Sequence, residues 1–245
     1  EYRRALDLEN AIASVSYATE ADDANGTLTT KDYVGIPREG TAHVVVQVTD
    51  NAATNGANLL AAYTAAKALE PGGNALSATN RAVVLVPPGP YDLGANTLAM
   101  DTEFVDLVGL STAREDQRIY GASTHVLTQT ASDIRIENLL LHYTGTSINV
   151  NAYYPDVSGV ASPATTTIRN CAFRVNDVSY RSMRESVEYA GTYEVCLAGG
   201  NYAFSGWCGT ASGTFTHCTG GNYAFGYIGT ASGTFTNCTG GYEAF

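Results

Sequence analysis

Residues 209–216, Gly-Thr-Ala-Ser-Gly-Thr-Phe-Thr, return unchanged as residues 229–236. A second motif, Gly-Asn-Tyr-Ala-Phe, occupies residues 200–204 and returns as residues 221–225. The copies of each motif lie about 20 residues apart, and a fixed internal period of this length is typical of proteins built from stacked structural repeats. The sequence therefore predicts a solenoid for at least its C-terminal part.

A shorter pattern of four residues extends the repeat toward the N-terminus. It begins with an apolar residue, its third residue is usually polar and often Asn, and it ends in Cys or Leu. Because side chains alternate along a strand, the first residue points inward, and an Asn at the third position can take a left-handed bend. We interpret each occurrence as one corner of a coil, and about seven coils stacked at about 4.8 Å would form a rod about 35 Å long. The pattern occupies residues 104–107, 136–139, 168–171, 193–196, 215–218 and 235–238, and Val195 alone breaks its polar rule in the later copies.

The composition favours an all-β protein and argues against several classes of partner. Charged residues make up only 15% of the 245 residues, and the chain contains 25 Gly with many Thr, Ser, Asn and Tyr, which suits short strands and tight turns. The formal charge of -11 opposes binding to nucleic acid, and it also disfavours acidic sugars unless a cation or a local basic groove intervenes. No apolar run approaches the roughly 20 residues needed to span a bilayer.

The region before the repeats has a distinctive order of elements. A β-branched run at residues 43–48 precedes an Ala- and Leu-rich helical segment at residues 58–69, which ends before Pro71. A second β run at residues 82–86 is followed by Pro-Pro-Gly-Pro-Tyr at residues 87–91. From about residue 44 to residue 93, this order resembles the start of pectate-lyase-like β-helix domains, including those of phage tailspikes. The resemblance implies a right-handed parallel β-helix whose open end is capped by the helix.

Three regions follow from this organisation. Residues 1–40 are expected to form a short helical lead-in and a linker, and the helix would need packing partners because it is too short to be stable alone. Residues 41–80 form the strand-helix cap, and residues 81–245 form the parallel β-helix. Residues 240–242, Gly-Gly-Tyr, resemble the start of a third copy of the Gly-Gly-x-Tyr motif, and the sequence stops three residues later, so we expect the solenoid to be truncated at its C-terminal end.

Four of the five cysteines share one position of the repeat, where Leu107 and Leu139 stand in earlier coils. Interchange with Leu favours small buried hydrophobic residues over the alternatives, which are disulfides or a ladder of metal ligands. The histidines show no metal-ligand spacing, and His217 stands where other coils carry Asn, so we expect it in a turn. Neither a metal nor another cofactor is expected. The four cysteines are Cys171, Cys196, Cys218 and Cys238, whereas Cys208 lies outside the ladder and its state stays open.

Catalytic signatures are scarce. A glycosidase needs two carboxyl groups beside a sugar groove, and a polysaccharide lyase needs a base near a group that neutralises charge. The motifs of pectin-degrading hydrolases are absent, apart from an Asp-Asp pair in the linker. Asp101, Glu103 and Asp106 surround one coil corner, and a second cluster mixes acids with arginines. This second cluster is the better candidate for a lyase base or a sugar site, although a solvated loop or subunit contact explains it more simply; it comprises Asp177, Arg181, Arg184, Glu185 and Glu188.

Aromatic residues recur in the last coils, and strand alternation cannot bury all of them. The exposed ones could stack on sugar rings or pack against a neighbouring solenoid. The candidates for carbohydrate binding are Tyr202, Trp207, Tyr223 and Tyr227.

We therefore expect a non-catalytic structural or receptor-binding module, contacting a cell-surface glycan, on an extracellular or virion fibre. The resemblance to tail fibres and tailspikes implies a homotrimer. A polysaccharide lyase or glycoside hydrolase with unrecognised catalytic residues is the main alternative, and a bacterial surface adhesin of the same fold is another. No nucleic acid is expected as a partner.

Overall fold

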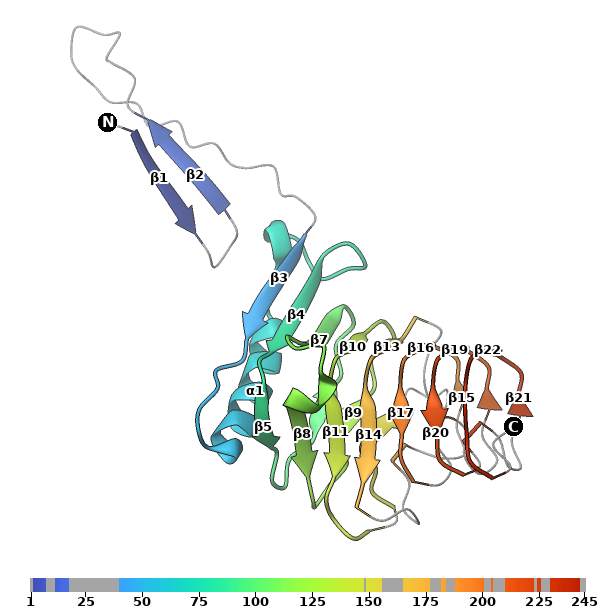
Figure 1. Ribbon diagram of the computed structural model, residues 1–245. Coiled ribbons are helices and arrows are strands. Elements are labelled where there is room, and N and C mark those ends of the chain that lie inside the picture. The colour runs from blue at the N-terminus through green and yellow to red at the C-terminus, as the bar shows by residue number, and fades with distance from the viewer. Residues whose placement is uncertain are drawn as a thin grey trace, which may run out of the picture.

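The computed structural model describes residues 2–7, 12–17, 40–147, 149–155, 165–176, 182–183, 188–200, 204, 210–222, 224–225 and 230–242. From residue 40 onward the strands are short and pair in parallel, and successive strands stack along one axis (Figure 1). The fold is predominantly β, with a single α-helix near the N-terminal end of the stack in the described residues. This arrangement is consistent with a parallel β-solenoid, as the repeats predicted.

Two long sheets run along the stack. The eight-stranded sheet consists of β3 (Thr41–Val45), β4 (Arg81–Val86), β7 (Val105–Gly109), β10 (Arg135–Glu137), β13 (Thr167–Arg169), β16 (Thr192–Glu194), β19 (Thr214–Thr216) and β22 (Thr234–Thr236). The six-stranded sheet consists of β5 (Gly89–Asp92), β8 (Gln117–Gly121), β11 (Leu140–Tyr143), β14 (Ala172–Val175), β17 (Leu197–Ala198) and β20 (Thr219–Gly220).

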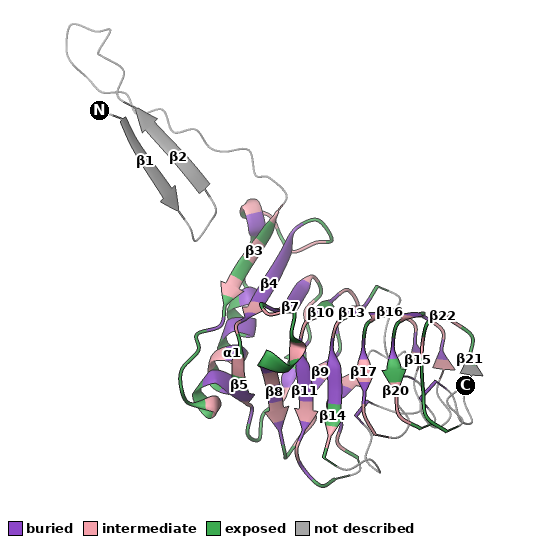
Figure 2. Cartoon of the chain, in the orientation of Figure 1, coloured by how far each residue is buried: buried purple, intermediate pink, exposed green. Residues whose placement is uncertain are grey.

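Two three-stranded sheets complete the rungs. One contains β6 (Leu98–Met100), β9 (Leu127–Gln129) and β12 (Tyr153–Pro155), and the other contains β15 (Glu188–Tyr189), β18 (Thr210–Ala211) and β21 (Thr230–Ala231). A rung is one strand of the eight-stranded sheet together with the strands that follow it in the chain. It ends where the next strand of that sheet begins. Figure 2 shows buried residues on the strands along the stack, and exposed residues on β3, on β20 and in connecting loops.

The corner predicted from the four-residue pattern is confirmed in five rungs. Its first residues lie opposite one another in register, from Ile136 through Ile168, Tyr193 and Phe215 to Phe235. The third residue has a left-handed backbone in every one of these rungs, with φ of 58° at Asn138, 48° at Asn170, 54° at Val195, 53° at His217 and 51° at Asn237. The turn role expected for His217 is therefore confirmed, and Val195 bends like the others.

The corner assigned to residues 104–107 was wrong by three positions. Leu107, the last residue of that match, lies opposite Ile136, the first residue of the next one. Asp106 therefore stands within β7, where the Arg81 guanidinium binds its carboxylate, and not at a bend. Gly109, the last residue of β7, lies beside Asn138, whose carbonyl oxygen would lie 2.2 Å from an added Cβ. The equivalence of Leu107 with the cysteines falls with this correction, whereas Leu139 keeps its place.

The cysteine ladder lies in the core, as its interchange with Leu indicated. Cys171, Cys196 and Cys218 are buried, Cys238 in the last described rung is half-buried, and all four are free thiols. Each Sγ donates to the carbonyl two residues before it and to a carbonyl of the preceding rung, as Cys171 does to Arg169 (3.3 Å) and Ile136 (3.5 Å). Burial raises the pKa of Cys171 to about 12. Cys171 is therefore a structural side chain in the neutral form.

Aromatic rings fill the core of the last rungs in two stacked columns. The ring centroids are 4.9 Å apart between Tyr193 and Phe215 and 5.1 Å apart between Phe215 and Phe235, with nearly parallel planes. Phe204 stacks on Phe225 at 5.1 Å and meets the first column edge-on. Offset-stacked and edge-to-face contacts are the favourable geometries for aromatic pairs, so identical residues one rung apart stabilise the register.

The predicted capping helix is present as α1 (Ala52–Ala66), somewhat earlier in the chain than the segment 58–69. Asn51 caps it by accepting from the backbone N–H of Thr54 (3.0 Å), and the chain turns away through η1 (Pro71–Gly73). Its buried face, including Leu59 and Tyr63, belongs to the same apolar core as the strands. The helix therefore covers the apolar interior at the N-terminal end of the stack (Figure 1).

Tight backbone contact fixes α1 against β5. Asn55 is fully buried, and its side-chain amide donates to the carbonyls of Thr49 (3.0 Å) and Pro90 (3.1 Å). Beside it, a Cβ added to Gly56 would lie 1.9 Å from the carbonyl oxygen of Asp92. The helix approaches β5 this closely only because residue 56 has no side chain.

The helical lead-in expected at residues 1–17 was wrong. Residues 2–7 and 12–17 form β1 (Tyr2–Asp7) and β2 (Ile12–Tyr17), an antiparallel pair in which Tyr2 lies opposite Tyr17. A helix of this length is marginal without a partner, whereas two antiparallel strands satisfy each other's backbone groups locally. The expected linker at residues 21–40 lies outside the described residues, except for Gly40.

The contact of α1 with β5 gives a first prediction. Gly56→Ala should lower the free energy of unfolding by about 1–3 kcal/mol, because the new methyl group forces the helix away from Asp92. The matched change Ala57→Gly, at an exposed position of the same helix, should cost about 1 kcal/mol through helix propensity alone. Chemical denaturation measures both, and a Gly56→Ala variant more stable than the wild type would contradict this packing.

The corners give a second prediction. A β-branched residue is strained in the left-handed conformation that Val195 adopts, whereas Asn tolerates it and has amide neighbours in the same column. Val195→Asn should therefore raise the free energy of unfolding by about 1 kcal/mol. Val195→Thr keeps the branched Cβ and serves as the control with no gain, and equal stabilities for the two variants would argue against strain at this corner.

Candidate functional site

Most of the site residues proposed from the sequence lie outside the described residues, namely Asp177, Arg181, Arg184 and Glu185 of the mixed cluster and the aromatic residues Tyr202, Trp207, Tyr223 and Tyr227. Cys208 also lies outside them. Glu188 of the mixed cluster is described: it lies half-buried in β15 and accepts a hydrogen bond from the hydroxyl of Ser212. The functional assignments stay predictions from the sequence.

The acidic cluster at residues 101–106 is divided among separate contacts. Asp106 is almost fully buried and accepts both arms of the Arg81 guanidinium, at 2.7 and 2.6 Å, while Arg81 also reaches Asp133 at 2.8 Å. Asp101 pairs with Lys67 of the segment after α1 at 3.1 Å, and Glu103 is exposed. Because a buried ion pair satisfies its own charges, Asp106 is a structural residue and not a catalytic one.

A different group of side chains comes together on the outer face of the six-stranded sheet. The register aligns Asp92, Tyr120, His142 and Arg174 in one column across β5, β8, β11 and β14. Arg118 precedes Tyr120 by two residues and therefore points to the same face, where its guanidinium lies 4.7 Å from the centre of the Tyr120 ring. We call Arg118, Tyr120, His142 and Arg174 the outer strip.

Hydrogen bonds hold the imidazole of the outer strip in one orientation. Nη2 of Arg118 lies 3.0 Å from Nδ1 of His142, and Nε2 of His142 lies 2.9 Å from Oδ1 of Asn176. Because a guanidinium only donates, Nδ1 must accept, and Nε2 carries the hydrogen that is donated to Oδ1 of Asn176. His142 is therefore neutral in this arrangement, with a fixed tautomer.

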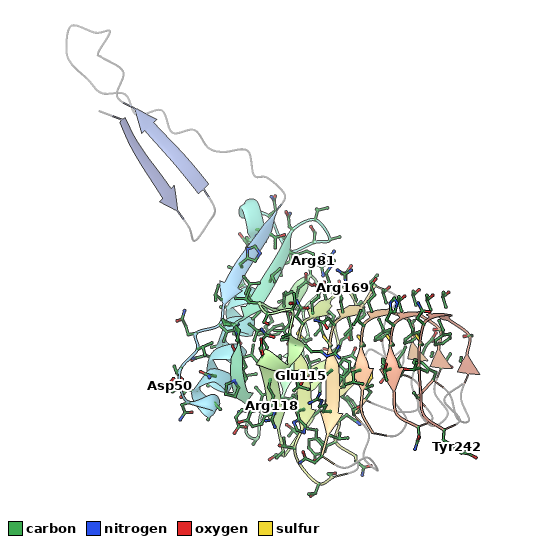
Figure 3. The ribbon with its side chains drawn as sticks, in the orientation of Figure 1. Asp50, Arg81, Glu115, Arg118, Arg169 and Tyr242 are labelled. Carbon is green, nitrogen blue, oxygen red and sulfur yellow. The ribbon has the colours of Figure 1, made fainter. Side chains whose placement is uncertain are left out.

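The loop between β7 and β8, which contains η2 (Arg114–Asp116), borders the outer strip. Glu115 of this loop accepts from Nη2 of Arg174 at 2.8 Å, and Figure 3 shows Glu115 and Arg118 on the same face of the stack. Beside them Leu140 and Ala172 point away from the core and are nevertheless buried. The site thus combines an apolar floor with a border of arginine, imidazole and phenol groups.

Arg114 of the same loop reaches further along the stack. Its Nη1 donates to the carbonyl of Val195 at 2.7 Å and lies 3.3 Å from Oδ1 of Asn170. Asn170 in turn donates to the carbonyl of Thr112 (2.7 Å) and to the side chain of Asn138 (2.9 Å). The loop is therefore fixed to the corner column, which fixes Glu115 relative to Arg174.

The electrostatics of the outer strip favour neutral imidazole. Burial and the positive charge of Arg118 lower the pKa of His142 below its ordinary value of 6.5, and Arg174 adds to the effect, while Asn176 and Glu115 act in the opposite direction. A neutral imidazole between two guanidinium groups can accept a proton, and the guanidinium groups can hold an anion. The strip can thus bind acidic groups, and it places one weak base beside them.

Sequence reasoning missed the outer strip although one signal was present. His142 and Arg174 each follow the corner asparagine of their rung by four residues, so aligned corners would have placed them together. Arg118 could not be found in this way, because the loop inserted after Gly109 breaks the count. In the later rungs the same column contains only glycines, namely Gly199, Gly221 and Gly241.

Comparison of the chain with protein-family models, with curated proteins and with solved structures found no match in any of the three. The fold and the outer strip are therefore the basis for a function. In the described part of the chain, no helix has the length and apolar character that crossing a membrane requires.

The lowered pKa of His142 gives a third prediction. The folded protein protonates His142 less readily than the unfolded chain, so stability from this group is present above about pH 6.5 and is lost as the pH falls. His142→Gln should flatten this dependence of the free energy of unfolding on pH. Nuclear magnetic resonance titration of the imidazole, assigned with the same variant, should give a pKa below 6.5.

Arg118→Gln should move the pKa of His142 upward, because it removes a neighbouring positive charge. Arg169→Gln serves as the control, since Arg169 pairs with Glu194 on the other long sheet. A pKa of His142 at or above its ordinary value in the wild type would contradict the described contact.

Proposed function

We propose that this chain is a non-catalytic right-handed parallel β-helix module, of the pectate-lyase-like kind, that binds a cell-surface glycan or receptor on a fibre or surface protein. Handedness is supported by a general rule, because crossover connections between parallel strands of one sheet are right-handed in nearly all proteins. The order of strand, α1, strand and Pro-Pro-Gly-Pro-Tyr supports the family resemblance.

The outer strip is the observation that carries the binding role. Tyr120, His142 and Arg174 stand in adjacent rungs about 4.8 Å apart, on a face that extends along the stack. A row of aromatic and hydrogen-bonding groups at regular spacing suits an elongated ligand that lies parallel to the axis. The ladders of corner residues, thiols and rings behind this face keep the row rigid, which limits the entropy lost on binding.

A polysaccharide lyase is the second candidate, and one observation favours it. A lyase needs a base beside a group that neutralises a carboxylate, and His142 is a neutral base in contact with Arg118 and next to Arg174. Glycoside hydrolysis is less well supported, because it requires two carboxyl groups across the sugar and the outer strip itself contains none. A bacterial adhesin would share the fold and the binding role.

Location and assembly are proposed on the resemblance to tail fibres and tailspikes. We place the module outside the cell or on a virion, as a homotrimer. The helical stalk once expected at residues 1–17 gives no support to the trimer, since that segment is a strand pair. Analytical ultracentrifugation tests the trimer directly, and a monomer at micromolar concentration would contradict it.

The experiment that tests the function combines a glycan array with a depolymerisation screen. We expect the folded chain to bind at least one surface polysaccharide without releasing new reducing ends or unsaturated products. Cleavage that is lost in His142→Ala would establish the lyase and overturn the non-catalytic assignment. A folded sample that neither binds nor cleaves any glycan would contradict the glycan-binding role.

A further inference from the structure

We propose that the outer strip binds the acidic groups of an anionic glycan, with Arg118 as the primary contact and Arg174 as the second. This inference rests on the proposed glycan-binding function and names the class of ligand. The acidic groups are carboxylates, sulfates or phosphates on an extended polymer. Binding measurements with different acidic polymers separate these sources.

Arg118 differs in its partners from the other buried and half-buried arginines of the described residues. Arg81 binds the carboxylate of Asp106 with both arms, and Arg114 lies 3.9 Å from the Glu115 carboxylate. Arg118 has no carboxylate partner in the described part of the chain, and its Nε–H is buried without an acceptor there. Within the described residues its hydrogen bond goes to an imidazole nitrogen, and its guanidinium lies over the Tyr120 ring, with Cζ 4.7 Å from the ring centre.

A guanidinium without a carboxylate is unusual in a chain with 24 acidic and 13 basic residues. Stacking on Tyr120 and the contact with His142 fix its orientation without neutralising its charge. Because the Nε–H is buried, the Nη groups are the donors that this fixed, planar cation can offer to carboxylate, sulfate and phosphate oxygens. Arg118 is thus a preorganised cation whose counter-ion is supplied from outside the described residues.

Arg174 offers the second contact. Its only ion pair in the described residues is with Glu115, and both side chains are nearly half exposed, at 44% and 45%. Exposed pairs of this kind contribute little to stability, so a ligand anion can replace Glu115 or bind beside it. Because Arg118 and Arg174 lie on strands two rungs apart, about 10 Å, one small anion cannot bridge them. An acidic polymer with repeated charges can.

Proton binding at His142 is linked to the ligand. The groups that face its imidazole are Arg118 and Tyr120 of β8, Arg174 of β14 and Glu115 of the loop, with Asp92 further along the column. An anion beside the two guanidinium groups offsets their charge and so favours imidazolium. Protonated His142 no longer accepts from Arg118, which frees that N–H for the ligand. Affinity should therefore rise as the pH falls from about 7.5 to about 5.5.

The test measures binding by isothermal titration calorimetry of the full chain with heparin, polygalacturonate, a teichoic acid and neutral dextran. We expect at least one acidic polymer to bind and dextran not to bind. Arg118→Gln should weaken binding at least about tenfold, the loss expected for a charge-assisted hydrogen bond. Arg169→Gln, an exposed arginine on the other long sheet, should change affinity less than twofold if binding is local, which is about 0.4 kcal/mol.

A second measurement does not depend on any variant folding. In the wild-type chain, binding of an acidic polymer should raise the pKa of His142, because binding and protonation favour each other. Equal losses of affinity in Arg118→Gln and Arg169→Gln would overturn the inference while leaving glycan binding intact. An unchanged pKa of His142 on binding would do the same. Binding of dextran alone would overturn it in the same way, whereas binding to no glycan at all would refute the proposed function itself.

Discussion

Five successive rungs of this protein, those that begin at β10, β13, β16, β19 and β22, turn at a residue held in a left-handed backbone conformation, and this part of the stack depends on that bend recurring in register. The bend brings the next residue, a cysteine or Leu139, back into the core, and there each cysteine thiol finds a carbonyl of the preceding rung. It also places the side chain at the bend in a column outside the core, where Asn170 contacts Asn138 and Asn237 contacts His217. One local conformation thus determines the inside and the outside of the stack together.

The same constraint explains which features could be predicted. The period, the corner and the buried cysteines follow from residue types that must recur wherever the backbone recurs, so one sequence was enough to find them. The first corner was misplaced because Asp106 imitates the polar residue of the pattern, while Gly109 achieves close contact by lacking a side chain. The N-terminal strand pair was missed because an apolar spacing over six residues fits a helix or a strand equally well.

The candidate site could not be predicted from the order of residues in the sequence, for a different reason. Its side chains come from three rungs, and their proximity becomes evident only when the strands are aligned. The loop that contains Glu115 changes the residue count in its rung, so Arg118 could not be aligned with the later rungs from the sequence. Downstream, the column changes from Tyr120, His142 and Arg174 to Gly199, Gly221 and Gly241. There a Cβ on Gly221 would lie 1.8 Å from the carbonyl of Gly200, so close backbone approach replaces side-chain chemistry. The chemical face is therefore confined to the middle rungs.

The loop containing Arg114 changes how such a stack should come apart. In a solenoid each repeat contacts only its neighbours, so rungs can separate one after another from an open end. Arg114, inserted in the rung of β7 and β8, binds the carbonyl of Val195 three rungs further on. Fraying that starts at β22 can pass through β19 without breaking this hydrogen bond, but detaching the rung of β16 must break it. The middle rungs thus behave as one cooperative unit, and the outer strip lies inside it.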